Sequence, residues 1–384
     1  MTKTVLRIGI FTDTFTPDIN GVVTVIQMMT RELTSRGHEV IIFCPKHRGD
    51  HTDHDGVCRF PSVRFVFYKG LRMAIPFSRK AFRQFPTLDI IHSHDPGPMG
   101  WLAHRAARRF GIAHIHTYHD LYVDYRRYLP RLVRPSRNLV KRLSRYLGDR
   151  CDAVIAPSEQ MRIELSSYGI TRPIYALPFG VDARDFEHTI DWNARQELNL
   201  PTEDLLLYAG RVGMEKNLDF LLRVFKRIHN EKPSVRLVIA GDGPHRKALE
   251  QYAATLGVDA ITVFTGFLNR RDLIDFYKQA TLFVFPSTTD TQGLVIMEAM
   301  MAGAAVVSVN VLGPVDVIRN GETGILVNPV EEEFANACLG LLGDDRARAT
   351  MGAAATRWAR SNTSRVSTGR LLEIYGRHQK VNEY

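Results

Sequence analysis

The chain has 384 residues, of which 45% are hydrophobic, and it carries 50 Lys and Arg against 41 Asp and Glu. This length allows two or three domains with sizeable cores, and the 4 cysteines show neither a disulfide framework nor metal-ligand spacing, as is usual in a reducing cytosol. The longest apolar stretch, residues 299–309, is far shorter than the about 20 residues of a membrane-spanning helix. Because the amino end lacks the pattern of a signal peptide, we expect no export by that route.

Two series of strand patterns alternate with helical patterns along the chain. The first series lies at residues 5–11, 39–44, 89–92, 113–116 and 153–156. After a turn-rich passage at residues 177–182, the second series lies at residues 205–210, 235–240, 261–264, 282–285 and 305–308. This alternation predicts the α/β class, with two Rossmann-like domains that meet near residues 180–200. A last amphipathic stretch follows at residues 365–378.

The loop after the first strand, residues 15–24, is a candidate for binding phosphate. Its Gly21 allows close approach of the backbone, and the helix that follows presents the N–H groups of its first turn. The three-glycine spacing of a dinucleotide fingerprint is absent, and an ordinary turn is the alternative interpretation.

Two cations lie in the loop after the first strand of the second series. Arg211 and Lys216 follow the carboxyl end of that strand, where ligands of open α/β sheets bind. Their charge could neutralise a departing diphosphate. The alternative, a pair of surface cations at a helix start, is disfavoured by the helix dipole.

The polar loop after the strand at residues 282–285 carries the second half of this candidate site. Asp290 comes first, Gly293 and Leu294 begin a predicted helix, and Glu298 stands eight positions after Asp290. The amides and the dipole at the helix start can hold a diphosphate, while the two carboxylates can accept hydrogen bonds from hydroxyl groups of a sugar and of a ribose. This layout suits a nucleotide-sugar. In the alternative, Asp290 caps the helix and Glu298 lies on its solvated face.

Histidines gather at two further places in the chain. His114, His116 and His119 lie at and just after a predicted strand, but no carboxylate pairs with them at ligand spacing, and packing is the usual role of such residues. The acidic and histidine-rich residues 50–55 lie in a polar stretch and are interpreted as a solvated loop. We therefore expect no metal site at either place.

The net positive charge lies entirely in the first half of the chain. Residues 1–185 carry 28 Lys and Arg against 17 Asp and Glu, and the remainder carries 22 against 24, which implies an anionic partner for the first half. The segment Arg126–Arg145 mixes cations with leucines in a pattern typical of a helix at a membrane interface, and residues 64–83 form a second mixed patch. The alternatives are an ordinary amphipathic helix with its apolar side inward, or nucleic acid, for which no recognised module is present.

Four motifs together resemble the retaining glycosyltransferases of the GT-B type. They are the GRVGMEKN run from Gly210, the GDGP turn from Gly241, the PSTTDTQGLVIMEAMMAG run from Pro286 and the GETGILV run from Gly321. The mark of that family is two glutamates separated by seven residues, from which this chain departs because Asp290 stands in the first place. The runs around Asp290 and His119 are most similar to the diacylglycerol glucosyltransferases of bacterial membranes.

The resemblance implies an architecture and a set of roles. Two Rossmann-like domains, residues 1–185 and 200–358, would face each other across a cleft, with a helix at residues 360–384 packing back on the first. The second domain would bind the nucleotide-sugar donor through Arg211, Lys216, Asp290, Gly293, Leu294 and Glu298. The first domain would contribute Gly21 at the diphosphate and His119 at the donor sugar. Among these residues His119, Asp290, Arg211 and Lys216 would be catalytic, and no metal or other cofactor is implied.

The expected function is transfer of a hexose, glucose from UDP-glucose, onto a membrane lipid such as 1,2-diacylglycerol. The family implies retention of the anomeric configuration. We expect a cytoplasmic enzyme that docks on the inner face of the cell membrane through Arg126–Arg145 and has no nucleic-acid partner. The alternatives are a mannosyl- or glucosyltransferase with a soluble or polysaccharide acceptor, and a non-catalytic protein that binds a nucleotide-sugar or a membrane surface.

Overall fold

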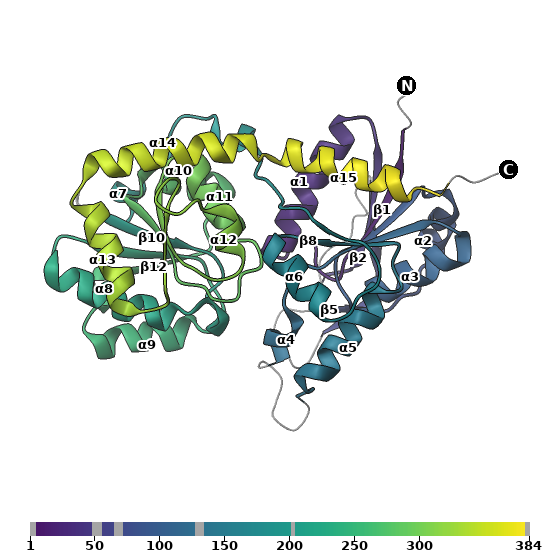
Figure 1. The fold of residues 1–384 in the computed structure, drawn as a ribbon, viewed down its shortest axis with the longest axis horizontal. Helices are drawn as coiled ribbons and strands as arrows, with labels where there is room; N and C mark the ends of the chain where they lie inside the picture. The colour runs from purple at the N-terminus through teal and green to yellow at the C-terminus, as the bar shows by residue number, and fades with distance from the viewer. Residues whose placement is uncertain (1–4, 48–55, 65–71, 127–133, 201–203, 381–384) are drawn as a thin grey trace. The chain divides into compact units, whose positions relative to one another are not determined.

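The computed structural model describes residues 5–47, 56–64, 72–126, 134–200 and 204–380 (Figure 1). The chain divides into two compact units, one formed by Met1–Phe179 with Ser364–Tyr384 and the other by Gly180–Thr363. Each unit contains a parallel sheet with helices, so the predicted α/β class with two Rossmann-like domains is confirmed.

In the first unit, the described residues form a seven-stranded parallel sheet of order β3-β2-β1-β6-β7-β8-β9. Its strands are β1 (Arg7–Phe11), β2 (Glu39–Pro45), β3 (Val57–Phe60), β6 (Ile90–Ser93), β7 (Ala113–Thr117), β8 (Ala153–Ala156) and β9 (Ile174–Ala176). The helices of this unit are α1 (Gly21–Ser35), α2 (Arg79–Gln84), α3 (Pro98–Phe110), α4 (Tyr122–Tyr125), α5 (Arg137–Gly148), α6 (Glu159–Ser167) and α15 (Ser364–His378). A separate antiparallel ribbon consists of β4 (Ser62–Arg64) and β5 (Arg72–Ala74).

The core of the first unit includes a cluster of aromatic rings under β1 and β2. Phe11 and Phe43 come from these two strands, and Phe85 follows α2; their ring centroids lie 4.6 to 5.4 Å apart. All three side chains are buried, so the cluster stabilises the folded unit through its buried apolar area and its ring contacts.

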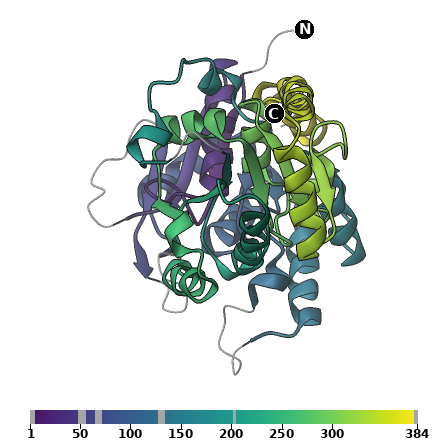
Figure 2. The ribbon, with the colours of Figure 1, turned by 90° about the vertical axis from the view of Figure 1, so that its left-hand side faces the viewer.

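The second unit contains, within the described part of the chain, a six-stranded parallel sheet of order β12-β11-β10-β13-β14-β15. Its strands are β10 (Leu205–Ala209), β11 (Arg236–Ala240), β12 (Thr262–Gly266), β13 (Leu282–Phe285), β14 (Ala305–Val309) and β15 (Ile325–Val327). Its helices are α7 (Ala194–Glu197), α8 (Leu218–Glu231), α9 (Arg246–Leu256), α10 (Arg270–Gln279), α11 (Leu294–Met301), α12 (Gly313–Val317), α13 (Glu331–Leu342) and α14 (Asp345–Ser361). Figure 2 shows the helices of this unit around its sheet from a second direction.

The strand order of each sheet places a ligand site. In the first unit the chain runs outward from β1 to β3 and then resumes on the other side of β1 with β6, and in the second unit it does the same around β10 and β13. Open α/β sheets bind ligands outside the carboxyl ends of the strands at such a reversal point. We therefore expect ligands to bind at the loops after β1 and β6 in the first unit and after β10 and β13 in the second.

The last helix, α15, belongs to the first unit and packs against α1 (Figure 1). The Tyr375 hydroxyl lies 2.7 Å from Nδ1 of His92 on β6, and the Arg36 guanidinium after α1 donates to the carbonyl of Arg365. Among the helices built from the described residues, none combines the length and the apolar character that a membrane span requires.

Candidate active site

In the second unit, the loops after β10 and β13 meet through side chains that the sequence singled out. Lys216 ends a short 3₁₀ turn, Met214–Lys216, and its Nζ lies 2.8 and 2.9 Å from the two carboxylate oxygens of Asp290. The Thr289 hydroxyl donates to the carbonyl of Glu215 at 3.1 Å, which ties the same loops together. The structure therefore brings the predicted cation and the predicted carboxylate into contact.

The GDGP turn supports the loop that carries Arg211. The N–H of Val212 donates to the carbonyl of Asp242 at 3.0 Å, and the N–H of His245 donates to the carbonyl of Val212 at 3.1 Å. Gly241 has a φ of 147°, and a Cβ there would lie 1.9 Å from the carbonyl oxygen of Gly210. Only glycine allows this approach, so the two motifs act as one backbone unit.

Gly293 forms the N-cap of α11 with a φ of 78° and without a side-chain cap, and Leu294 is the first residue of the helix. The interpretation of Asp290 as the cap of this helix is therefore wrong, and Asp290 contacts Lys216 instead. The first amides of an α-helix lack intrahelical acceptors, so the start of α11 presents donors and a partial positive charge to an anion.

Glu298 lies on α11 with its side chain buried, so its placement on a solvated helix face is wrong. Arg270 forms an ion pair with one of its oxygens, and the Tyr277 hydroxyl donates to the other at 3.0 Å. Both partners come from α10 and were missed by sequence reasoning, because nothing in the spacing of an Arg and a Tyr on one helix reveals a carboxylate on another. A carboxylate offers about four lone-pair sites, so Glu298 can still accept a further hydroxyl.

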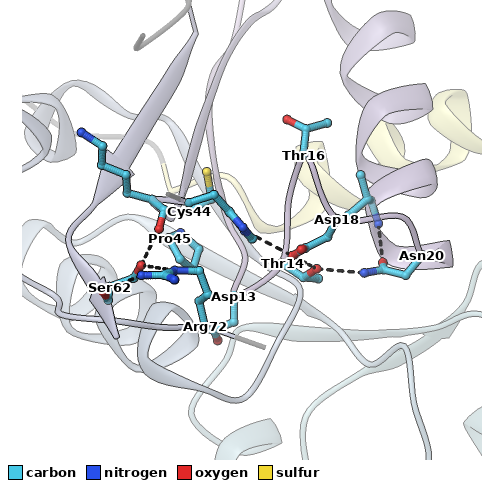
Figure 3. Close-up of polar contacts among 12 residues, drawn as sticks. Asp13, Thr14, Thr16, Asp18, Asn20, Cys44, Pro45, Ser62 and Arg72 are labelled. Carbon is cyan, nitrogen blue, oxygen red and sulfur yellow. Dashed lines mark hydrogen bonds and ion pairs between the residues drawn. The ribbon is translucent and has the colours of Figure 1, made fainter. Parts of the chain in front are cut away.

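In the first unit, Gly21 is the first residue of α1. Asn20 is the N-cap: its side chain accepts from the N–H of Val23 at 3.0 Å and donates to the Thr14 hydroxyl at 2.9 Å (Figure 3). The Thr14 hydroxyl in turn donates to Asp18 at 2.9 Å. A Cβ built on Gly21 meets nothing within 4 Å, and its φ is ordinary, so the packing of this unit does not require glycine here.

His119 follows β7 and is buried, with 8% of its surface exposed. Its Nε2 lies 2.8 Å from Nδ1 of His94, and its ring stacks on Phe179 at a centroid distance of 5.9 Å. Burial, with a smaller contribution from His116, lowers the pKa of His119 to about 3, so its ring is neutral at physiological pH.

The other two histidines of the triplet have a packing role. His114 and His116 both bond to the hydroxyl of Ser93, each at 2.8 Å. Across the described ranges, no group of three or more His, Cys, Asp or Glu side chains is arranged to hold a metal ion. The acidic and histidine-rich residues 50–55 lie outside the described residues.

The buried face of α5 is not formed by its large apolar residues, as it would be in an ordinary amphipathic helix. Its buried residues are Val140, Ser144 and Gly148, whereas Leu139, Leu143 and Tyr146 are 48%, 49% and 42% exposed. The cations Arg137, Arg142 and Arg145 are exposed as well. Arg145 pairs with Asp149 at 3.4 Å, and Lys141 pairs with Glu164 at 3.5 Å and lies over the ring of Tyr168. The inward-facing alternative therefore does not fit α5. Residues 127–133 of the predicted segment, and residues 65–71 of the second patch, lie outside the described residues.

Comparison with known proteins assigns both units to glycosyltransferases. Residues 190–358 match the family described as Glycosyl transferases group 1, and residues 19–185 match Glycosyltransferase Family 4. An alpha-monoglucosyldiacylglycerol synthase of Streptococcus pneumoniae is 36% identical over 315 residues, which cover 79% of this chain and 71% of that protein. A protein of the same name from Acholeplasma laidlawii is 26% identical over 345 residues, covering 85% of this chain and 86% of its own length.

Solved structures agree on the fold. The Anabaena protein HepE, in complex with UDP and glucose, has a TM-score of 0.81 at 18% identity and covers 97% of this chain and 100% of its own. The resemblance to GT-B glycosyltransferases drawn from the four motifs is thus confirmed. The chain therefore belongs to the GT-B glycosyltransferases, the family of the Streptococcus pneumoniae synthase.

Proposed function

We propose that the protein transfers glucose from UDP-glucose to the free hydroxyl of 1,2-diacylglycerol, with retention of the anomeric configuration, at the inner face of the cell membrane. The observation that carries the proposal is the contact of Lys216 with Asp290 at the reversal point of the second sheet, in a chain 36% identical to a protein named alpha-monoglucosyldiacylglycerol synthase. The exposed leucines and arginines of α5 support the lipid acceptor.

In the proposed donor site, charge on the diphosphate is met by Arg211, Lys216 and the amides around Gly293 and Leu294. As the bond between the anomeric carbon and the diphosphate oxygen breaks, negative charge grows on the leaving group, and donors already oriented toward it stabilise the transition state. Glu298, held by Arg270 and Tyr277, accepts hydroxyls of the ribose. Asp290 accepts from a hydroxyl of the sugar, and His119 donates to one.

Retention follows if the acceptor hydroxyl attacks the face that the diphosphate leaves. The hydroxyl oxygen bonds to the anomeric carbon, and its proton passes to an oxygen of the departing diphosphate, so no protein base is needed. We propose that no metal ion takes part, because side-chain cations and helix amides meet the diphosphate charge. Transfer should then persist after removal of divalent ions by a chelator.

Substitution of Asp290 tests whether the shorter acid performs the role of the family glutamate. We expect Asp290→Asn to reduce transfer strongly, because the amide offers its oxygen without the charge that orders both Lys216 and a sugar hydroxyl. Asp290→Glu should remain active. Steady-state rates of sugar transfer measure both; wild-type rates in both variants would contradict a contact with the donor sugar.

Substitution of Gly21 separates a ligand contact from a structural role. Gly21→Ala should leave the unit as stable as before or stabilise it by up to about 1 kcal/mol, since the position is helical and open. The donor Michaelis constant should rise, because the methyl group stands where the diphosphate approaches. Gly340→Ala, on α13 with equally open surroundings, is the matched control and should change stability alone. Unchanged donor affinity in Gly21→Ala would remove Gly21 from the site.

A donor-by-acceptor screen tests the function as a whole. UDP-glucose, UDP-galactose and GDP-mannose are each offered with diacylglycerol vesicles or with water-soluble sugars, and products are separated by thin-layer chromatography. We expect glucosyldiacylglycerol as the main product. Transfer only to soluble acceptors would favour polysaccharide assembly, and binding of nucleotide-sugar without release of nucleoside diphosphate would indicate a protein without turnover.

A further inference from the structure

We propose that His94 is a positioning residue, which fixes the orientation and the tautomer of His119 so that His119 donates a hydrogen bond from Nδ1. The functional half of this inference rests on the proposed role of His119 at the donor sugar; the tautomer half does not. His94 lies immediately after β6, at the reversal point of the first sheet, and its backbone N–H donates to the carbonyl of Phe11 on β1 at 2.9 Å.

The two rings form a clamped pair inside the first unit. Nδ1 of His94 lies 2.8 Å from Nε2 of His119, and the ring planes are within 20° of each other. Phe179 stacks on His119 and His92 lies beside His94, with ring centroids 4.3 Å apart for the two histidines. His94 is fully buried. A rotation of the His119 ring would break the bond to His94 and disturb this stack, so one orientation is favoured.

Both rings are neutral, because burial lowers the pKa of each well below its usual range. A neutral imidazole carries one N–H and one lone pair. In the bond between the rings, one nitrogen therefore donates and the other accepts, and the question is which ring supplies the hydrogen.

The surroundings of the far nitrogen of His94 answer it. Nε2 of His94 is buried and meets no hydrogen-bond partner among the described residues. A buried N–H without an acceptor is rarer in proteins than an acceptor without a donor, so Nε2 carries the lone pair and Nδ1 carries the hydrogen. His94 then donates to Nε2 of His119, and the hydrogen of His119 resides on Nδ1. This assignment comes from the bonding network.

The assigned tautomer limits what His119 can do. With Nε2 occupied by His94, the ring cannot take up a proton there, and with a hydrogen on Nδ1 it is a neutral donor. A neutral donor suits a sugar hydroxyl whose oxygen accepts. His119 would therefore orient the transferring sugar and would not act as a general base.

The functional test compares two replacements of His94. His94→Leu removes the donor, and His94→Asn keeps an N–H near the position of Nδ1. We expect kcat to fall about 10- to 100-fold in His94→Leu, as for other residues that orient a functional histidine, with UDP affinity by calorimetry little changed. His94→Asn should recover most of this loss. His114→Leu, which removes an equally buried imidazole bonded to Ser93, is the matched control and should lower stability without this change in kcat.

The direct test does not depend on an activity assay. Nitrogen-15 NMR of protein labelled at histidine distinguishes a nitrogen that bears hydrogen from one with a lone pair, and His119 is assigned by its loss in His119→Ala. We expect hydrogen on Nδ1 of His119 in the wild-type protein and a mixture of tautomers in His94→Leu. Hydrogen on Nε2 in the wild type would overturn the assignment, and a wild-type kcat in His94→Leu would overturn the positioning role. If the protein transfers no sugar, the NMR result still decides the tautomer, so the two failures are distinguishable.

Discussion

Lys216→Ala is expected to lower kcat on the order of 100-fold or more, because the lysine meets charge that develops on the diphosphate as the sugar departs. The fold should survive the change. The side chains of Lys216 and Asp290 are 17% and 19% exposed, so water can reach the carboxylate that loses its partner, and the free energy of unfolding should fall by only about 1 kcal/mol. Initial rates of UDP release with acceptor present measure the first effect, and thermal unfolding measures the second.

A second lysine of the same unit provides the control for this experiment. Lys232 donates to the carbonyl of Leu342 at 3.0 Å and forms an ion pair with Asp204, away from the loops after β10 and β13. Lys232→Ala should therefore cost stability to a similar degree and leave kcat unchanged. Arg211→Ala should resemble Lys216→Ala. If both donor-site variants turned over at near-normal rates, the assignment of the two cations to the diphosphate would be wrong.

Replacing Arg137 and Arg142 together with Ser is expected to weaken binding to phosphatidylglycerol vesicles by up to about 2 kcal/mol, or roughly 30-fold, since each cation near an anionic leaflet contributes about 1 kcal/mol. Both side chains are exposed on α5 beside Leu139 and Leu143, and Arg145 is left in place because it pairs with Asp149 at 3.4 Å. Flotation of the protein with vesicles, repeated over a range of salt, measures the change. Binding by the wild type should weaken as salt screens the surface.

The same helix supplies the matched control. Lys141 pairs with Glu164 and lies over Tyr168, so Lys141→Ser should change vesicle binding little although it removes the same charge. UDP affinity should be unaffected in every variant, because the proposed donor cations belong to the other unit. Vesicle binding that does not change with salt concentration would indicate that the leucines insert into the membrane instead. Failure of the wild type to float on any vesicle, together with full activity on a soluble acceptor, would refute the lipid acceptor.

Strands made of a fully buried apolar run could be predicted from the sequence, whereas half-buried strands of three residues could not. The run at residues 282–285 is entirely buried, and its composition alone indicates β13. By contrast β9 has three half-buried residues, and β15 is equally short and half-buried. Such segments become strands because a neighbouring strand already offers its edge, as β8 does for β9. Local sequence carries little of that information.

The helix α5 illustrates the same limit for surfaces. The pattern within Arg126–Arg145 correctly predicted a helix, which in the structure begins at Arg137. Whether the leucines face inward depends on which side of the helix packs against the rest of the unit. In the structure the small residues Ser144 and Gly148 and one valine, Val140, form the buried face, so leucines and arginines are exposed together.

The sequence by itself determined the α/β class, the family and the loop positions of Arg211, Lys216 and Asp290. It could do so because the loops that follow parallel strands lie at one edge of the sheet, and because the spacing of a motif along the chain is kept within such a loop. Only the tertiary structure decided which side chains form hydrogen bonds and ion pairs with the predicted site residues. Glu298 finds Arg270 and Tyr277, and His119 finds His94, on different elements that lie 21 to 28 residues away in the chain. Their pairing arises because a buried polar group must find a hydrogen-bond partner wherever packing places one, and sequence separation does not encode that choice.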